Sequence, residues 1–410
     1  MSKPDARGML TVDQALGQLL AGARPVAEIE TVPTLEAAGR VLATAQEATI
    51  NVPPLDNTSM DGYAVRAVDC ASGAARLRVA QRIAAGDVGR TLEPGTAARI
   101  FTGAPIPAGA DAVVMQELCT AEGTDVIVRH VPSPGEWIRR VGEDIKRGSR
   151  ILEAGRRLKP QDTGLAASVG IARLPVRRRL RVAVFFTGNE LVMPGEALPE
   201  GAIYNSNRFT LTALLQALGC EVTDLGIVPD LFAATREALV KAAAGSDLVV
   251  TSGGMSVGEE DHIRPAVEAE GRIDLWKIAV KPGKPLAFGA LSRGNGGEAH
   301  FIGLPGNPVS GFVTFLVFVR PFVLACQGVR EIMPRTYKVR ADFDWPKPDE
   351  RREFLRARLN SGGGLDLFPN QSAAVLTSTV WSDGLIDNPA KQSIARGDSA
   401  AFVPFSELLS

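Results

Sequence analysis

The run Asp247-Leu-Val-Val-Thr-Ser-Gly-Gly254 predicts a buried strand that ends in a diglycine turn. A short, continuous apolar run of this kind is typical of a strand inside a parallel sheet. Neighbouring runs repeat the pattern, with strand-like residues at 180–186 and 222–228 and helix-like residues at 209–218, 231–244 and 307–326. This alternation predicts an α/β domain over residues 179–330, with a mostly parallel sheet covered by helices.

The rest of the chain predicts further domains, since 410 residues exceed what one core usually serves. Thr11-Val-Asp-Gln14 has the form of a capping box, and residues 34–42 and 156–170 also look helical. We therefore expect a helical N-terminal and linking domain from residues 1–45 and 147–178. Short β-prone runs between Gly/Pro turns predict an inserted β-rich domain over residues 46–146, and residues 331–410 look like a small β-barrel-like domain.

Composition narrows the classes of partner. Lysines and arginines number 45 against 46 aspartates and glutamates, so no global charge favours nucleic acid or an anionic membrane. The densest basic run, Arg177-Arg178-Arg179 with Arg181, abuts a predicted strand, which favours a domain junction over a nucleic-acid surface. Four scattered cysteines fit a reducing compartment, and the most apolar run is too short to span a membrane. The expected location is the cytoplasm.

Three loops rich in glycine and proline follow, or lie beside, short apolar runs that look like strands. They are Thr251-Ser-Gly-Gly-Met-Ser-Val-Gly-Glu-Glu-Asp261, Lys281-Pro-Gly-Lys-Pro285 and Leu304-Pro-Gly-Asn-Pro-Val-Ser310. Gly253 and Gly254 let backbone N–H groups face a ligand, with Ser256 as a further donor. Lys281, Lys284 and the upstream Lys277 suit phosphate oxygens. A surface turn, or capping of a helix by Asn307, explains single loops equally well; together the loops predict a pocket for a phosphate-bearing anion.

Carboxylates follow three of the predicted strands. Glu190 lies in Thr187-Gly-Asn-Glu190, Asp230 follows the strand at 222–228, and Asp261 ends the first glycine loop. Such oxygens bind Mg²⁺ together with substrate phosphates. Stabilisation of a helix dipole is an equally good explanation for Asp261 alone. Only three histidines occur, without paired spacing, so a histidine-based zinc site is not expected.

Three polar motifs stand out in the β-rich segment. They are Asn51-Val-Pro-Pro-Leu-Asp-Asn-Thr-Ser-Met-Asp-Gly-Tyr-Ala-Val65, Phe101-Thr-Gly-Ala-Pro105 and Arg139-Arg-Val-Gly-Glu-Asp144. They contribute Asp61, Thr102 and Asp144 as candidates. An Asp-Gly pair is first of all a turn signal, so surface loops and functional loops remain even alternatives on this evidence.

In this order and spacing, these motifs resemble the MoeA family of molybdopterin molybdenumtransferases, to which the gephyrin E domain is related. The resemblance covers nearly the whole chain. It implies that adenylylated molybdopterin reacts with molybdate to give molybdenum cofactor, with release of AMP. It also implies a homodimer whose active site joins the β-rich domain of one subunit to the sheet domain of the other. Tungstate is close enough to molybdate in size and charge to fit the same description.

The resemblance also implies site residues. The matching positions are Asp61, Thr102, Asp144, Glu190, Asp230, Asp261, Lys277, Lys281, Pro305 and Pro308. On this basis Glu190 and Asp261 hold Mg²⁺ at the phosphoanhydride, and the diglycine loop and Lys281 grip the pterin phosphate. Lys277 and Thr102 position molybdate, and Asp61 of a second subunit orients reacting groups or water. Lys284 and Asn307, with Ser256, complete the expected ligand contacts. Asn189 and Asn205 stand where the family pattern has aspartates.

Two other functions stay open at this stage. A gephyrin-like, non-catalytic dimeric scaffold would bind a peptide without releasing AMP. A nucleotide-pyrophosphate hydrolase would use the same sheet edge, since a fold does not fix a function. The retained acidic residues favour the transferase. Expected partners are the enzyme that adenylylates molybdopterin and the molybdoenzymes that receive the product, with neither nucleic acid nor membrane among them.

Overall fold

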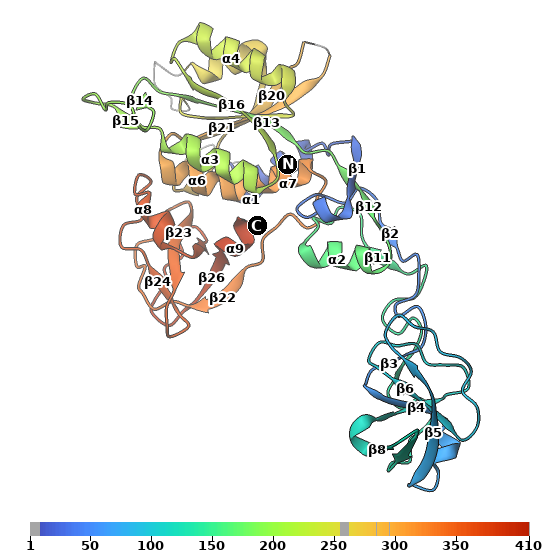
Figure 1. Cartoon of the computed structure of the whole chain (residues 1–410). Helices are drawn as coiled ribbons and strands as arrows, with labels where there is room; N and C mark the ends of the chain where they lie inside the picture. Colours follow the sequence, from blue (N-terminus) through green and yellow to red (C-terminus); the bar gives the residue numbers. More distant parts are fainter. Residues whose placement is uncertain (1–8, 255–261, 284, 295, 410) are drawn as a thin grey trace.

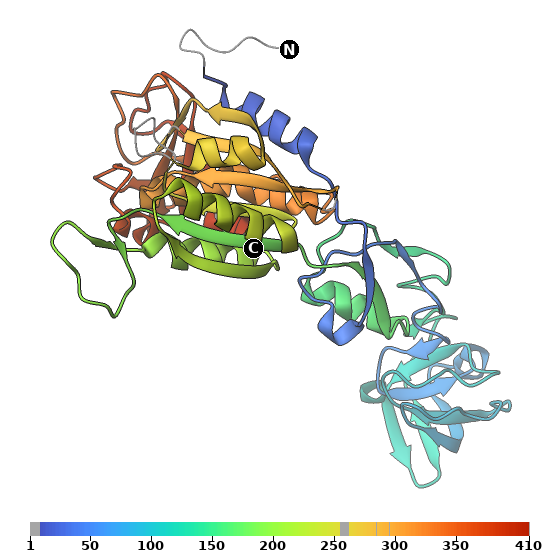
Figure 2. The same cartoon turned by 90° about the horizontal axis from the view of Figure 1, so that it is seen from above.

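The computed structural model describes residues 9–254, 262–283, 285–294 and 296–409. A sheet with its helices lies at one end of an elongated chain, and a β-rich lobe lies at the other (Figure 1; Figure 2). A second β lobe sits beside the helices of the sheet. We call residues 57–139 the distal lobe and residues 337–408 the C-terminal lobe. The multidomain α/β class predicted from the sequence is confirmed.

The central sheet has six strands in the described part of the chain. Their order is β16 (Glu221–Val228), β13 (Arg181–Thr187), β17 (Leu248–Ser252), β21 (Glu298–Leu304), β20 (Pro285–Ser292) and β18 (Gly271–Lys277). The first four run parallel, and β20 and β18 join as antiparallel pairs. The buried faces of β13 and β17 explain their continuous apolar sequences. β21, which lies between β17 and β20, and β18, at the edge of the sheet, were not among the predicted strands.

Helices cover both faces of this sheet. One face packs against α1 (Val12–Gly22), α3 (Ser206–Ala217) and the continuous helix formed by α6 (Pro308–Thr314), a π-helical turn (Phe315–Val319) and α7 (Arg320–Cys326). The other face packs against α4 (Phe232–Gly245) and α5 (Ile263–Glu270). Among the described residues, the helix Pro308–Cys326 alone is long and apolar enough to cross a membrane, but 89% of that window is buried, as in a core helix.

The N-terminal and linking region is less helical than predicted. The capping box of α1 forms, with Thr11 and Gln14 bonding reciprocally, and α2 (Pro160–Ser168) confirms the helix predicted over residues 156–170. The helix expected over residues 34–42 is wrong. The strand β1 (Ile29–Pro33) pairs antiparallel with β12 (Arg173–Arg177), and only a short 3₁₀ turn, η1 (Thr34–Glu36), follows. Pairing with a distant segment overrides the weak local helical preference, which Gly39 lowers further.

Two chain segments run side by side into the distal lobe. The strand β2 (Gln46–Glu47) pairs with β11 (Arg150–Leu152), and Val52 bridges Ile145. The short pair β3 (Asn57–Thr58) and β10 (Ile138–Arg139) follows. Beyond it lies a sheet of β7 (Ala112–Met115), β4 (Gly62–Val65), β6 (Thr96–Ile100), β5 (Ala75–Ile83), β9 (Asp125–Val128) and β8 (Cys119–Glu122), in that order. The β-rich segment thus leaves and re-enters the linking region at one place.

The C-terminal lobe is also built from strands. The order is β23 (Arg352–Leu359), β25 (Gly384–Asn388), β26 (Ser399–Pro404) and β22 (Tyr337–Arg340), with β24 (Leu365–Leu367) paired to β23. Ala341, which follows β22, bridges Leu365 in β24, so the hydrogen-bonded path returns to where it began. The short strand β19 (Val280–Lys281) pairs with β23 and connects the loop after β18 to this lobe.

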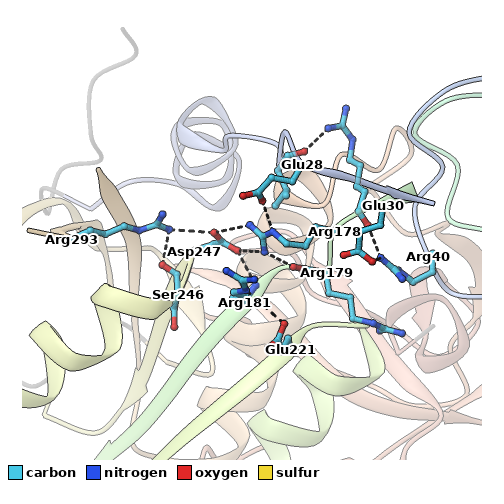
Figure 3. A network of polar contacts seen from close by, with 12 residues as sticks. Glu28, Glu30, Arg40, Arg178, Arg179, Arg181, Glu221, Ser246, Asp247 and Arg293 are labelled. Carbon is cyan, nitrogen blue, oxygen red and sulfur yellow. Dashed lines mark hydrogen bonds and ion pairs between the residues drawn. The ribbon is translucent and has the colours of Figure 1, made fainter. Parts of the chain in front are cut away.

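The basic run lies where the linking region meets the amino ends of β13 and β17 (Figure 3). Arg178 forms ion pairs with Asp247, at 3.0 Å, and with Glu28. Arg293 approaches the other oxygen of Asp247 at 3.2 Å, and the backbone N–H of Arg181 donates to the same carboxylate. Burial raises the pKa of Asp247, but the bonds from Arg178 and Arg181 outweigh burial, so its pKa is lowered. The predicted domain junction therefore accounts for these charges.

Candidate active site

The ends of three parallel strands meet at one edge of the central sheet. The register aligns Phe186 of β13 with Ser252 of β17, and Ser252 with Leu304 of β21. Because these strands are parallel, the loops after Thr187, Ser252 and Leu304 leave from the same edge. Ligands in open α/β sheets bind beyond this carboxyl edge. β18 runs in the same direction as β21, so Lys277 at its end reaches this edge too.

The diglycine turn is held between the two neighbouring loops. Gly253 has a φ of +103°, and a Cβ at this position would lie 2.1 Å from the carbonyl oxygen of Thr187. Its N–H donates to the carbonyl of Leu304 at 3.3 Å, and its Cα lies 3.7 Å from where a Cβ of Gly306 would be. Gly254 continues the turn with a φ of +59°. Only glycine allows the backbones of these loops to approach one another this closely.

A side chain that the sequence did not indicate fastens two of the loops. The Asn207 amide, in the first turn of α3, donates to Ser252 Oγ at 2.9 Å and to the carbonyl of Gly306 at 2.7 Å. Ser252 Oγ in turn donates to the carbonyl of Pro305 at 3.0 Å. Two residues earlier, Asn205 caps α3 by accepting from the N–H of Arg208 at 3.1 Å. The departure from aspartate at position 205 therefore keeps the capping function.

The loop before β20 lies against the start of α6. A Cβ at Gly283, whose φ is +99°, would meet Ser310, Thr314 and Pro305 within 3.5 Å. Pro305 is buried and Pro308 is half-buried at the first turn of α6. Asn307 occupies the N-cap position, but its exposed side chain makes no capping hydrogen bond, which corrects the capping role considered above. The Asn307 side chain is thus available to a ligand.

The described acidic candidates surround this edge at different degrees of exposure. Glu190 is exposed after β13, and Asp230 is half-buried two residues after the end of β16. Ser256, Asp261 and Lys284 lie outside the described residues. Within the described ranges, no group of three Asp, Glu, His or Cys side chains is placed to hold a metal ion. Mg²⁺ needs only one or two protein carboxylates when substrate phosphates supply other ligands, so Glu190 suits it as one donor.

Lys281 is already engaged by acidic groups. Its ammonium nitrogen lies 3.1 Å from Glu353 Oε1 and 3.3 Å from Asp349 Oδ2, both in the C-terminal lobe. Glu353 is fully buried and also accepts from the indole N–H of Trp345 at 2.8 Å. Hydrogen bonds from Arg351 and then Lys281 hold the pKa of Asp349 well below its usual range. Much of the charge of Lys281 is therefore neutralised within the chain.

A second cation, Arg356, is buried inside the C-terminal lobe. Arg356 of β23 is 1% exposed and donates to Ser378 Oγ at 3.2 Å and to the carbonyl of Ser372 at 3.3 Å. Burial lowers its pKa to about 10, so it stays charged at neutral pH. No carboxylate pairs with its guanidinium among the described residues. The loop that holds Arg356 contacts α6, because the carbonyl of Ala373, next to Ser372, accepts from the N–H of Val309 at 3.0 Å.

Asp61 and Thr102 form a compact pair in the distal lobe. Asp61 Oδ1 accepts from both the backbone N–H and the hydroxyl of Thr102, each at 2.7 Å. The backbone bond and then the hydroxyl bond lower the pKa of Asp61, with a smaller effect from the charge of Arg99. The structure therefore brings together these two residues, which are 41 positions apart. Asp144 is exposed near Val52, in the segment that joins the distal lobe to the linking region.

The structure separates the predicted residues into two groups. The loops after β13, β17 and β21 belong to the central sheet, whereas Asp61 and Thr102 belong to the distal lobe at the opposite end of the chain (Figure 1; Figure 2). The linking region, with α2 and the pair β2–β11, lies between them. Within one chain these two groups do not meet.

Three family models match successive segments of the chain. Residues 10–170 match the MoeA N-terminal region (domain I and II), residues 183–325 match a probable molybdopterin binding domain, and residues 338–405 match the MoeA C-terminal region (domain IV). The chain belongs to the MoeA family. The resemblance noted from the sequence motifs is thereby confirmed.

Relatives of this family match over full length. The molybdopterin molybdenumtransferase of Haemophilus influenzae is 40% identical over 98% of this chain and 100% of its own length. Molybdopterin molybdenumtransferase 2 of Mycobacterium tuberculosis is 35% identical over 92% of this chain and 94% of its own. The solved structure of a molybdopterin biosynthesis MoeA protein from Pyrococcus horikoshii OT3 superposes with a TM-score of 0.85 at 28% identity, covering 97% of this chain and all of that one.

Proposed function

We propose that this MoeA family member joins molybdate to adenylylated molybdopterin, with release of AMP, in a site shared between two subunits. That the chain is a transferase of molybdenum cofactor biosynthesis rests on its full-length relatives. One observation chiefly supports the release of AMP in a site shared between two subunits. Three glycine loops converge at the carboxyl edge of the central sheet, and the Asp61–Thr102 pair lies far from it in the same chain.

The glycine loops suit a phosphate group. Gly253 and Gly254 have positive φ values, which turn backbone N–H groups outward without a Cβ in the way. The ligand of this half of the site is the pterin with its phosphate. Lys277, exposed at the end of β18, and Asn307, with its side chain uncommitted to capping, add polar contacts around it.

The metal belongs at the phosphoanhydride. Mg²⁺ bound there would relieve charge as AMP leaves. Glu190 would hold it from the exposed loop after β13, with Asp261 and the substrate oxygens as further ligands. Asp230 follows β16, the neighbour of β13, whose following loop carries Glu190, and would help to orient the metal or its water.

Cationic groups at the sheet would receive molybdate. Arg356 keeps its charge in the interior of the C-terminal lobe, and its loop touches α6 beside the site. Lys281 would exchange part of its bond to Glu353 and Asp349 for the oxyanion. Lys277 completes this set. Positive groups fixed around an oxyanion act more strongly in a site that excludes water.

A second subunit supplies the remaining half. Asp61 is held in its ionised form by Thr102 and can orient a reacting group or a water molecule once it faces the partner's sheet. A twofold dimer gives two such sites at once. The four cysteines are unpaired thiols, three of them buried, which agrees with a cytoplasmic location.

The direct test is an incubation of the purified protein with adenylylated molybdopterin, Mg²⁺ and limiting molybdate. We expect AMP and molybdenum cofactor in equal amounts, and little AMP when molybdate is left out. AMP release from ordinary dinucleotides without molybdate would instead identify a pyrophosphate hydrolase. Peptide binding without any AMP release would identify a scaffold.

A further inference from the structure

Two arginines in the distal lobe lie over one aromatic ring. The guanidinium carbon of Arg82, on β5, is 4.3 Å from the centroid of the Phe101 ring, and that of Arg99, on β6, is 4.7 Å from it. Arg99 also lies 5.2 Å from the ring of Tyr63. A guanidinium group stacked on a ring keeps its N–H edge free for an acceptor in its own plane. We call these three residues the Arg82–Phe101–Arg99 stack.

Arg99 is fixed in place without being neutralised. Its Nη1 donates to the carbonyl of Gly62 at 3.0 Å, and its Nη2 donates to Gln116 Oε1 at 2.6 Å. Neither acceptor carries a charge. In the described part of the chain, no carboxylate forms an ion pair with Arg82 or Arg99. Arg76, on the same strand as Arg82, differs in this respect because it pairs with Asp125 and Glu122.

The stack adjoins the Asp61–Thr102 pair. Phe101 directly precedes Thr102, and the N–H of Gln116, whose side chain holds Arg99, donates to the carbonyl of Asp61 at 3.1 Å. The charge of Arg99 is close enough to help keep Asp61 ionised. A ligand group that reaches Asp61 therefore comes near Arg99, which shares the Phe101 ring with Arg82.

The negative charge at the sheet edge suggests a role for Arg82 and Arg99. Glu190 and Asp230 contribute negative charge there, and Lys281 is largely neutralised by Glu353 and Asp349. A phosphoanhydride brought to that edge carries more negative charge still. The unneutralised arginines of the distal lobe add positive charge for the departing phosphate beyond what the metal and the cations at the sheet supply.

We propose that the Arg82–Phe101–Arg99 stack binds the phosphate of the adenylyl group while the pterin is held by the sheet of the other subunit. This subsite rests on the proposed function, because the adenylylated substrate is its ligand. The stack grips the phosphate that leaves as part of AMP, so it acts by binding and orientation. No bond is made or broken by the arginines themselves.

The test compares AMP affinity and substrate KM in matched variants of the full-length protein. R82Q removes an exposed arginine, R99Q removes the fixed one, and the double variant removes both. R78Q, an exposed arginine on the same strand β5, is the matched control for loss of charge. In the double variant we expect the Kd for AMP and the KM for adenylylated molybdopterin to rise about ten- to hundredfold. R78Q should stay within about twofold of the wild type.

The outcomes separate this subsite from the function on which it rests. A wild type that releases AMP, with a double variant whose Kd and KM are unchanged, would overturn the subsite alone. Loss of the dimer on sedimentation, with AMP affinity retained in the residual dimer, would show that the arginines pair with the partner's carboxylates and would overturn it too. A wild type that never releases AMP overturns the proposed function and this subsite together. R82Q keeps the test valid even if R99Q perturbs folding, because Arg82 is exposed.

Discussion

The carboxyl edge of the central sheet and the distal lobe contribute different kinds of group to the proposed site. The edge is made of backbone, since Gly253, Gly283 and Gly306 bring three loops within contact of one another. The distal lobe presents side chains, with Asp61 fixed by Thr102 and flanked by arginines. Backbone geometry defines the site at the edge, whereas charged side chains define it in the lobe. Under the proposed function, the two halves do not meet within one chain, so a second copy is required to complete the site.

The largest effect should come from the backbone half. G253A places a Cβ 2.1 Å from the carbonyl oxygen of Thr187 at a φ of +103°, so the loop must move. We expect AMP release to fall more than a hundredfold, because a displacement of about 1 Å in a site can have that effect. The measurement is the rate of AMP release.

The control for this prediction is G397A. Gly397 has a similar φ of +97°, but a Cβ there would meet nothing within 4 Å. G397A carries the same backbone strain, of about 1–2 kcal/mol, and should keep its activity. Equal loss of activity in the two variants would mean that strain, and not the approach of the loops, limits G253A.

Removal of Asp61 tests the charged half. D61A should lower AMP release by about a hundred- to ten-thousandfold if Asp61 orients a reacting group. The fold should not change, because the Asp61 side chain bonds to Thr102 and the backbone bond from Gln116 to Asp61 is kept in the variant. Circular dichroism, sedimentation and the rate of AMP release together check this. The control is E122Q, which removes the carboxylate that pairs with Arg76 in the same lobe and should remain active. A D61A variant with near-normal turnover would contradict the assignment.

A smaller effect is expected at Lys281. K281M should raise the KM for adenylylated molybdopterin or molybdate about tenfold, the usual size of one charge-assisted contact. The variant also leaves Glu353 buried without its cation, so the free energy of unfolding should fall. Steady-state kinetics and urea unfolding separate the two effects. K281R restores the charge, and recovery of stability without recovery of KM would limit Lys281 to a structural role.

The smallest effect on activity belongs to the junction shown in Figure 3. D247N removes the carboxylate shared by Arg178 and Arg293, which should lower the free energy of unfolding by about 3 kcal/mol while turnover of the folded enzyme changes little. Because the folded pKa of Asp247 is lowered, its stabilising effect is present above the unfolded pKa of about 3.9 and is lost as pH falls below it. Urea unfolding at pH 7 and pH 3.5 checks this, since the difference between wild type and D247N should shrink at the lower pH.

Local patterns in the sequence predicted most of the central sheet. Continuous apolar runs marked β13 and β17, and a reciprocal capping box marked α1. β21 was not predicted because His300 and Gly303 interrupt the apolar residues of Glu298–Leu304, so the strand lacks the continuous apolar run of β13 and β17. β1 and β12 could not be predicted because they pair across more than 140 residues, and no local signal encodes such a pairing.

The site was predictable to a similar degree. Motifs gave the glycine loops, Glu190, Asp61 and Thr102: each motif alone also fits a surface turn, but together, in this order and spacing, they indicate a site. Asn207 resembles any polar residue in the first turn of a helix, and Arg356 resembles an exposed arginine in an alternating strand. Their contacts to Ser252 and Ser378 come only from the folded chain. The pairing of Lys281 with Glu353 likewise depends on a β19–β23 contact between distant segments.

Subunit complementation tests the shared site most directly. D61A and E190Q chains, each inactive alone, are co-expressed with different tags so that mixed dimers form. If the distal lobe of one subunit completes the sheet edge of the other, a mixed dimer has one intact site, and the mixture should recover about a quarter of wild-type AMP release. If each site lies within one chain, no intact site can form. Absence of any recovery in purified mixed dimers would therefore contradict the shared site.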